Sequence, residues 1–144
     1  MSPMFGHKDE SPDGAAALQA EIGRAAALPL PELAAEVMAS VFGPDGPGGP
    51  GRPGTIDGPA EAANRLTLAD VTQAFTPAAG GRGVGADQLH RLSLLLAEAL
   101  QLLEHAALVR VSWRGGMENY LATRAGRTAV AQGAVTRVLA GGGR

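Results

Sequence analysis

The 144-residue sequence contains no cysteine, a single lysine and few aromatic side chains. The absence of cysteine excludes disulfide frameworks, thiolate metal sites and cysteine nucleophiles. No apolar run approaches the roughly 18 residues of a membrane span, and no secretory signal is visible at the N-terminus. We therefore expect a cytoplasmic protein without membrane contact. With three Phe, one Trp and one Tyr, its core must be mainly aliphatic.

Glycine (21 residues) and proline (10 residues) are abundant and unevenly spread. They are densest in 43–60, which holds seven Gly and five Pro and favours neither a helix nor a central strand. This distribution predicts four parts. They are a disordered tail (1–13), a pair of helices (14–43), a Gly/Pro-rich linker (44–60) and a folded domain (61–140).

The spacing of apolar residues predicts four helices before the last part of the chain. Two of them are expected over about 14–28 and 31–42. A third, short helix begins after Thr67, which opens a capping-box pattern, and ends near Phe75. The longest is expected over 86–107, where leucine and alanine fill one broad arc and polar residues the other side.

Residues 108–113 alternate apolar and polar side chains, which predicts a β-strand. A tight turn at Gly115–Gly116 and a returning strand over 118–122 complete a hairpin. Thr123 is placed to cap a last helix over about 124–139. The expected fold class is therefore mainly α with a small two-stranded β-wing.

Three segments of the second half carry a family resemblance: LTLADVTQAF, LLEHAALVRV and YLATRAGRTAV. Over about residues 66–139 the chain resembles the winged helix-turn-helix domains of MarR- and PadR-type bacterial regulators. In these domains a short helix opening with LT precedes a recognition helix that ends in LE-x-x-GLV. After a two-stranded wing, LT-x-x-GR starts the closing helix. Here Ala107 replaces the usual Gly, one extra residue separates Leu121 from Thr123, and a Gly-rich insertion after Phe75 enlarges the turn.

The resemblance implies a winged helix-turn-helix fold and, as its leading use, binding of double-stranded DNA by a dimeric transcription regulator. The charge distribution favours this use. Residues 1–81 carry ten acidic and four basic side chains, whereas residues 82–144 carry four acidic and eight basic ones. The candidate base contacts, on the long helix, are Gln88, His90, Arg91 and Ser93. The candidate phosphate contacts, on the wing and closing helix, are Arg110, Arg114, Arg124 and Arg127.

The alternative use is protein docking without DNA contact, through a homodimer or another protein partner. The polar side of the long helix favours this alternative, because it carries Glu98 and Glu104 but only one arginine, Arg91, and phosphate attracts basic helices. Leu94 also lies on that polar side as a large apolar residue. Both uses stay open from the sequence.

No residue pattern indicates catalysis or metal binding. The three histidines are His7, His90 and His105, and the last two lie about 22 Å apart along one helix, too far to share a metal or a proton. Neither an HExxH zinc motif nor a P-loop occurs. We expect a protein that is not an enzyme and holds no metal or cofactor.

Overall fold

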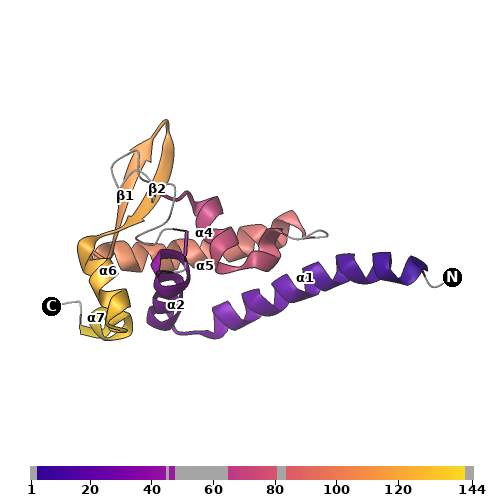
Figure 1. Cartoon of the computed structure of the whole chain (residues 1–144), viewed down its shortest axis with the longest axis horizontal. Helices are drawn as coiled ribbons and strands as arrows, with labels where there is room; N and C mark the ends of the chain where they lie inside the picture. The colour runs from indigo at the N-terminus through magenta and orange to yellow at the C-terminus, as the bar shows by residue number, and fades with distance from the viewer. Residues whose placement is uncertain (1–2, 45, 48–64, 81–83, 142–144) are drawn as a thin grey trace.

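The computed structural model describes residues 3–44, 46–47, 65–80 and 84–141 (Figure 1). This part of the chain is mainly helical, with six α-helices and one two-stranded antiparallel sheet. The helices are α1 (Pro3–Ala27), α2 (Leu30–Phe42), α4 (Leu68–Phe75), α5 (Ala86–His105), α6 (Arg124–Ala131) and α7 (Val135–Gly141), with a 3-10 helix η1 (Pro77–Gly80). The strands are β1 (Val109–Arg114) and β2 (Met117–Ala122). None of the described helices is both long and apolar enough to cross a membrane.

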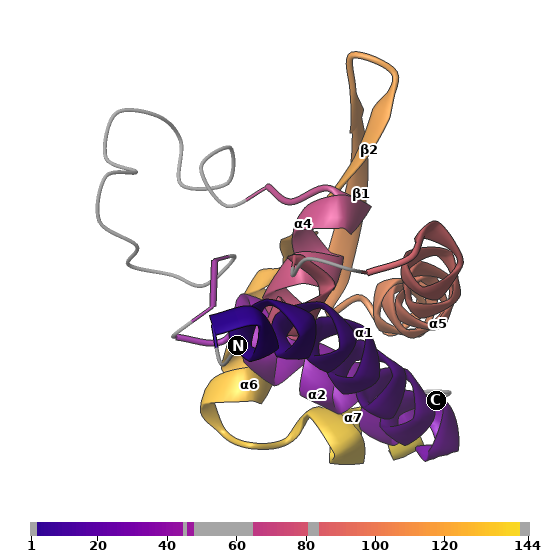
Figure 2. The ribbon, with the colours of Figure 1, turned by 90° about the vertical axis from the view of Figure 1, so that its right-hand side faces the viewer.

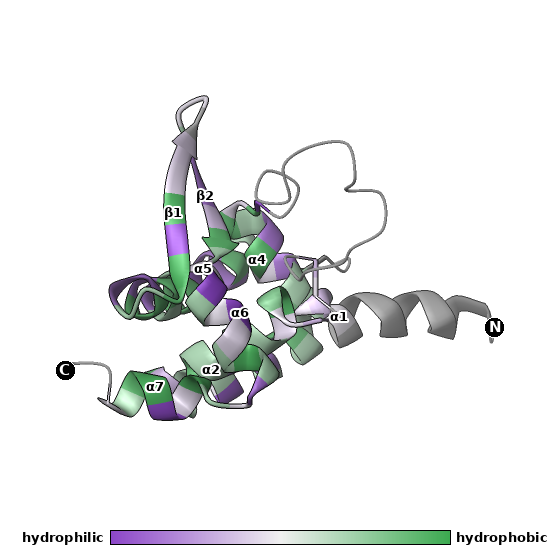
Figure 3. Cartoon of the chain, turned by 60° about the vertical axis from the view of Figure 1, so that its left-hand side comes forward, coloured by the Kyte–Doolittle hydropathy of each residue, from purple (hydrophilic) through white to green (hydrophobic). Residues whose placement is uncertain are grey.

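The core forms around one stripe of α5. Its residues Leu92, Leu96, Leu100 and Leu103 recur every three or four positions and are at most 1% exposed. Helices α1, α2 and α4 pack against α5, and the hairpin projects from this helical body (Figure 2). The base of the hairpin is hydrophobic where it meets the helices (Figure 3). The expected aliphatic core is confirmed.

Helix α1 begins earlier than the sequence predicted. It starts at Pro3 rather than near position 14, and it includes 3–13, which we expected to be a disordered tail. Leu18, Ile22 and Ala25 bury one side of its second half. These contacts anchor the helix, which continues N-terminally through Pro12. Because proline has no N–H, one carbonyl of the preceding turn is left without its helical hydrogen bond.

The predicted linker over 44–60 falls outside the described residues, apart from 44 and 46–47. Where the description resumes, Leu66 forms an isolated antiparallel bridge with Tyr120 of β2. Each residue donates its N–H to the carbonyl of the other, at 2.9 and 2.7 Å. Leu66 thus adds a one-residue third strand to the hairpin and joins it to the start of α4.

The predicted start of α4 is confirmed in atomic detail. Thr67 Oγ1 accepts a hydrogen bond from the Asp70 N–H at 3.1 Å, and Asp70 Oδ2 accepts one from the Thr67 N–H at 3.0 Å. This reciprocal capping box satisfies two backbone donors that the first helical turn leaves without partners. The helix ends at Phe75, as predicted.

Helix α5 ends in a Schellman motif built on an alanine. The N–H of Ala107 donates to the Glu104 carbonyl and the N–H of Leu108 to the Leu103 carbonyl, both at 2.9 Å. Leu103 and Leu108 are both buried, which supplies the apolar contact of the motif. Ala107 has a φ of 63° and is the one non-glycine residue with positive φ in the described segments. Glycine adopts this left-handed conformation without the steric cost that the Cβ of alanine brings, so Ala107 is a strained position.

The single closing helix predicted over 124–139 is wrong, because the structure divides it into α6 and α7. Gly133 adopts a φ of 62° and ends α6. Its N–H donates to the Val130 carbonyl at 3.0 Å, and the Ala134 N–H donates to the Ala129 carbonyl at 2.8 Å. Glycine adopts this left-handed conformation without steric cost, so a second Schellman motif interrupts the helix.

The hairpin and its junction with α6 agree with the prediction. β1 and β2 pair from Val109 opposite Ala122 to Arg114 opposite Met117. Thr123 caps α6, because its Oγ1 accepts from the Gly126 N–H at 2.9 Å.

Gly126 packs directly against the end of α5. A Cβ at this position would overlap the Leu108 carbonyl oxygen and lie 2.8 Å from Met38 Cε of α2. The backbones of α6 and of the α5–β1 junction therefore approach as closely as a glycine allows.

We expect Ala107→Gly to increase the free energy of unfolding by about 0.5–1 kcal/mol, because it relieves the left-handed strain at the end of α5. Urea denaturation followed by circular dichroism measures this change. The matched control is Ala106→Gly, since Ala106 has a φ of −86° and gains nothing from glycine. An equal or lower stability of Ala107→Gly would contradict the assignment.

We expect Gly126→Ala to lower the free energy of unfolding by about 2–3 kcal/mol, because the added methyl group must displace the Leu108 carbonyl or Met38. The same substitution at Gly23 of α1, where a Cβ meets nothing within 4 Å, should instead stabilise by up to about 1 kcal/mol. Paired denaturation curves test both changes. Similar effects at the two glycines would show that the α6 junction is not tightly packed.

Candidate nucleic-acid interface

Gln88, the first expected base contact, is occupied within the protein. Its side-chain carbonyl accepts a hydrogen bond from the Gly85 N–H at 3.2 Å. Its amide nitrogen donates to the Ala15 carbonyl at 3.2 Å and to Gln19 Oε1 at 3.1 Å. Gln88 thus caps α5 and ties it to α1, which leaves it little capacity to read a base edge.

The other three candidates on α5 do not form one surface. Ser93 is half-buried and lines a hollow of about 300 Å³ with residues of α4 and η1. His90 and Arg91 are exposed, and Arg91 lies beside α1 in a separate groove. The structure therefore brings together His90 and Arg91, while Gln88 and Ser93 point toward neighbouring helices.

The exposed side of α5 is acidic. Asp87, Glu98 and Glu104 are exposed there with a single arginine, Arg91. A DNA duplex carries one negative charge about every 1.7 Å along its axis, so this surface repels it.

A second acidic feature lies between α5 and the hairpin. The cleft there has a volume of about 230 Å³ and is lined by Ala97, Gln101, Glu104, Val111, Glu118 and Tyr120. The hydroxyl of Tyr120 donates to Glu118 Oε1 at 2.8 Å. Burial, together with the hydrogen bond and the negative charge of Glu118, raises the pKa of Tyr120 to about 12. The carboxylates of Glu104 and Glu118 therefore both line the cleft between α5 and the hairpin.

The opposite face of the hairpin carries arginines. Val111 lines the cleft with α5, so strand alternation puts Arg110 and Ser112 on the other face. Arg110 is paired with Leu121 of β2. Continuing the Leu66–Tyr120 bridge by one residue places Arg65 opposite Leu121 from the other side. Two arginines thus flank Leu121, which is only 3% exposed.

Two polar atoms on this face are buried without partners. Within the described segments, neither Arg65 Nε nor Ser112 Oγ makes a hydrogen bond. Buried polar groups are normally hydrogen-bonded, and each exception calls for an explanation.

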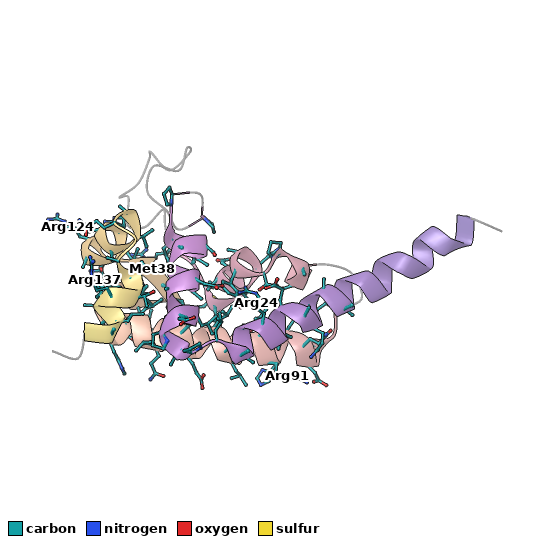
Figure 4. The ribbon with its side chains drawn as sticks, turned by 90° about the horizontal axis from the view of Figure 1, so that it is seen from below. Arg24, Met38, Arg91, Arg124 and Arg137 are labelled. Atoms are coloured by element: carbon teal, nitrogen blue, oxygen red, sulfur yellow. The ribbon has the colours of Figure 1, made fainter. Side chains whose placement is uncertain are left out.

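Helices α6 and α7 extend the arginine surface. Arg127 Nη1 donates to the Ala122 carbonyl at 3.2 Å, which holds the guanidinium next to β2. Arg124 and Arg137 are exposed and lie at the same end of the molecule, away from Arg91 (Figure 4). The backbone of Arg114 ends β1, but its side chain lies outside the described part of the structure. We call the arginines on or beside the hairpin, α6 and α7 the basic face; they are Arg65, Arg110, Arg124, Arg127 and Arg137.

Sequence reasoning missed two members of the basic face. Arg65 joins it only through the bridge between Leu66 and Tyr120, which are 54 positions apart in the chain. Arg137 lies on α7, beyond the turn at Gly133, at the same end of the molecule as Arg124 (Figure 4). The signal available in the sequence was the excess of arginine in the second half of the chain. Arg24, in the acidic first half, is instead held in ion pairs. Its guanidinium donates to Glu36 at 3.0 Å and to Glu21 at 3.2 Å.

Comparison of the chain with protein-family models, with curated proteins and with solved structures finds no match. The described residues contain no cluster of three His, Asp or Glu side chains that could hold a metal ion. The charges and contacts of the described residues are therefore the observations from which a function can be inferred.

Tyr120 provides a pH-dependent test of the acidic cleft. The folded protein holds the phenol proton more tightly than the unfolded chain, whose tyrosine pKa is 10.0. The resulting stabilisation is complete below pH 10 and is lost as the pH rises toward about 12. Across this window the free energy of unfolding of the wild type should fall on the order of 2 kcal/mol further than that of Tyr120→Phe. Denaturation series at increasing pH measure the difference, and parallel profiles would contradict it.

Proposed function

We propose that the chain is a winged-helix DNA-binding protein that contacts the phosphate backbone through its basic face rather than through α5. The order α4, α5, hairpin, α6 supports the winged-helix assignment, since it is the order that the MarR/PadR resemblance implies. The turn before α5 is enlarged by η1, and the exposed side of α5 is acidic. These features favour backbone contact from the wing side over base readout by a recognition helix.

The observation that carries the proposal is the separation of charge across the hairpin. Between positions 106 and 141 the chain has five arginines and one acidic residue, Glu118. Glu118 lies opposite Trp113 and lines the cleft on the α5 side, whereas Arg110 lies on the other face. Phosphate attraction supplies most of the affinity in sequence-independent DNA binding, so a surface of this sign is the one that duplex DNA would favour.

The salt dependence of binding to mixed-sequence duplex DNA tests the proposal. Each neutralised phosphate contributes about −0.9 to the slope of log K against log salt, so four or five contacts predict a slope near −4. In fluorescence anisotropy titrations, Arg110→Gln with Arg124→Gln should weaken binding and make the slope shallower by about 2. No binding at about 50 mM salt would overturn the DNA proposal.

The matched control is Arg91→Gln, which removes the single arginine of α5. Under the proposal this change leaves the slope unaltered, because Arg91 lies on α5, away from Arg124 and Arg137 (Figure 4). If Arg91→Gln flattens the slope and the basic-face variant does not, α5 is the DNA-contacting element.

Protein docking without DNA contact is the second candidate. It is favoured by two large apolar side chains near the hairpin turn, Trp113 at 65% and Met117 at 55% exposure. A protein that binds no DNA at low salt, and whose Trp113 emission shifts when a partner is added, would support this use instead.

A further inference from the structure

The exposed side of α5 centres on a leucine. Leu94 is 54% exposed, and polar residues flank it at helical spacing in both directions. Toward the N-terminus lie Asp87, His90 and Arg91, and toward the C-terminus lie Glu98, Gln101 and His105.

Two hollows adjoin this stripe where α5 meets α1 and the start of α2. One has a volume of about 340 Å³ and is lined mainly by apolar surface, including Ile22, Ala26, Leu94 and Leu95. The other, of about 370 Å³, contains Leu30 and Leu102. Glu98 borders both hollows. An elongated apolar groove with charged margins therefore follows α5.

We propose that this groove receives α5 of a second copy of the chain, in an antiparallel pair whose two-fold axis passes beside Leu94. The two-fold axis relates positions that lie equally far from Leu94 on either side. It therefore brings position 90 of one copy opposite position 98 of the other, and position 87 opposite position 101. His90 and Arg91 of each copy then face Glu98 of the other. A parallel pair would instead place like charges together.

Charge complementarity identifies the occupant. The one arginine of the stripe, Arg91, lies in its N-terminal half, and Glu98 lies in its C-terminal half. Asp87, also in the N-terminal half, falls opposite the uncharged Gln101 in the antiparallel pair. The stripe is thus complementary to its own inverted copy, as an isologous dimer interface requires. Its net negative charge disfavours phosphate. The groove lies on α1, α2 and α5, whereas the basic face lies on the hairpin, α6 and α7, so this inference does not depend on the proposed DNA contact.

A charge swap tests the pairing in the full chain. Arg91→Glu and Glu98→Arg should each weaken dimerisation at least about tenfold, because like charges meet twice across the axis. The double variant should recover wild-type association, since both contacts are re-formed with their signs exchanged. Thr128→Glu, at an exposed position of α6, is the control and should leave association unchanged. Sedimentation equilibrium detects association as a mass approaching twice the 14.5 kDa of one chain.

A cysteine placed on the axis gives an independent geometric test in a chain that has none. Mild oxidation should convert Leu94→Cys to a disulfide-linked dimer, while Ala131→Cys on α6 stays monomeric. A wild type that sediments as one chain throughout the concentration series, or a double swap that recovers nothing, would overturn the inference.

Discussion

The peptide segment 107–108 is the junction on which the rest of the structure depends. The N–H groups of Ala107 and Leu108 close the end of α5, while their carbonyls accept hydrogen bonds from Thr123, at 2.7 Å to its hydroxyl and 3.0 Å to its N–H. Gly126 packs against the same Leu108 carbonyl, and Met38 of α2 fills the remaining space. One segment therefore sets the direction of the hairpin relative to α5, α6 and α2. With that direction fixed, the carboxylates and the arginines fall on opposite faces of the sheet.

Local patterns in the sequence carried most of the fold. The capping box at Thr67, the alternation after Leu108 and the cap at Thr123 each involve residues within a few positions of one another, and all three were predictable. The break at Gly133 was missed because a glycine in a helical pattern ends the helix only where the residues that follow it can be buried in the core. Ala134 and Val135 are buried in this way, and their burial depends on the folded protein as a whole.

The candidate site was less predictable than the fold, because the contacts of its residues involve distant segments of the chain. Gln88 has the right chemistry for reading bases, but helix α1, more than 60 positions away, takes up its amide. The position of Arg65 depends on a bridge to β2. The run of arginines was visible in the sequence, whereas which face of the hairpin they occupy, and which acids face them, depended on contacts between distant segments.

The exposure of Trp113 has a consequence for spectroscopy. As the single tryptophan of the chain, placed near the hairpin turn and 65% exposed, it is already hydrated in the native state. Its emission should therefore change little when the helical body melts, so fluorescence is a poor monitor of unfolding for this protein. For the same reason it is a selective monitor of anything that covers the hairpin, because only a bound surface excludes water from the indole.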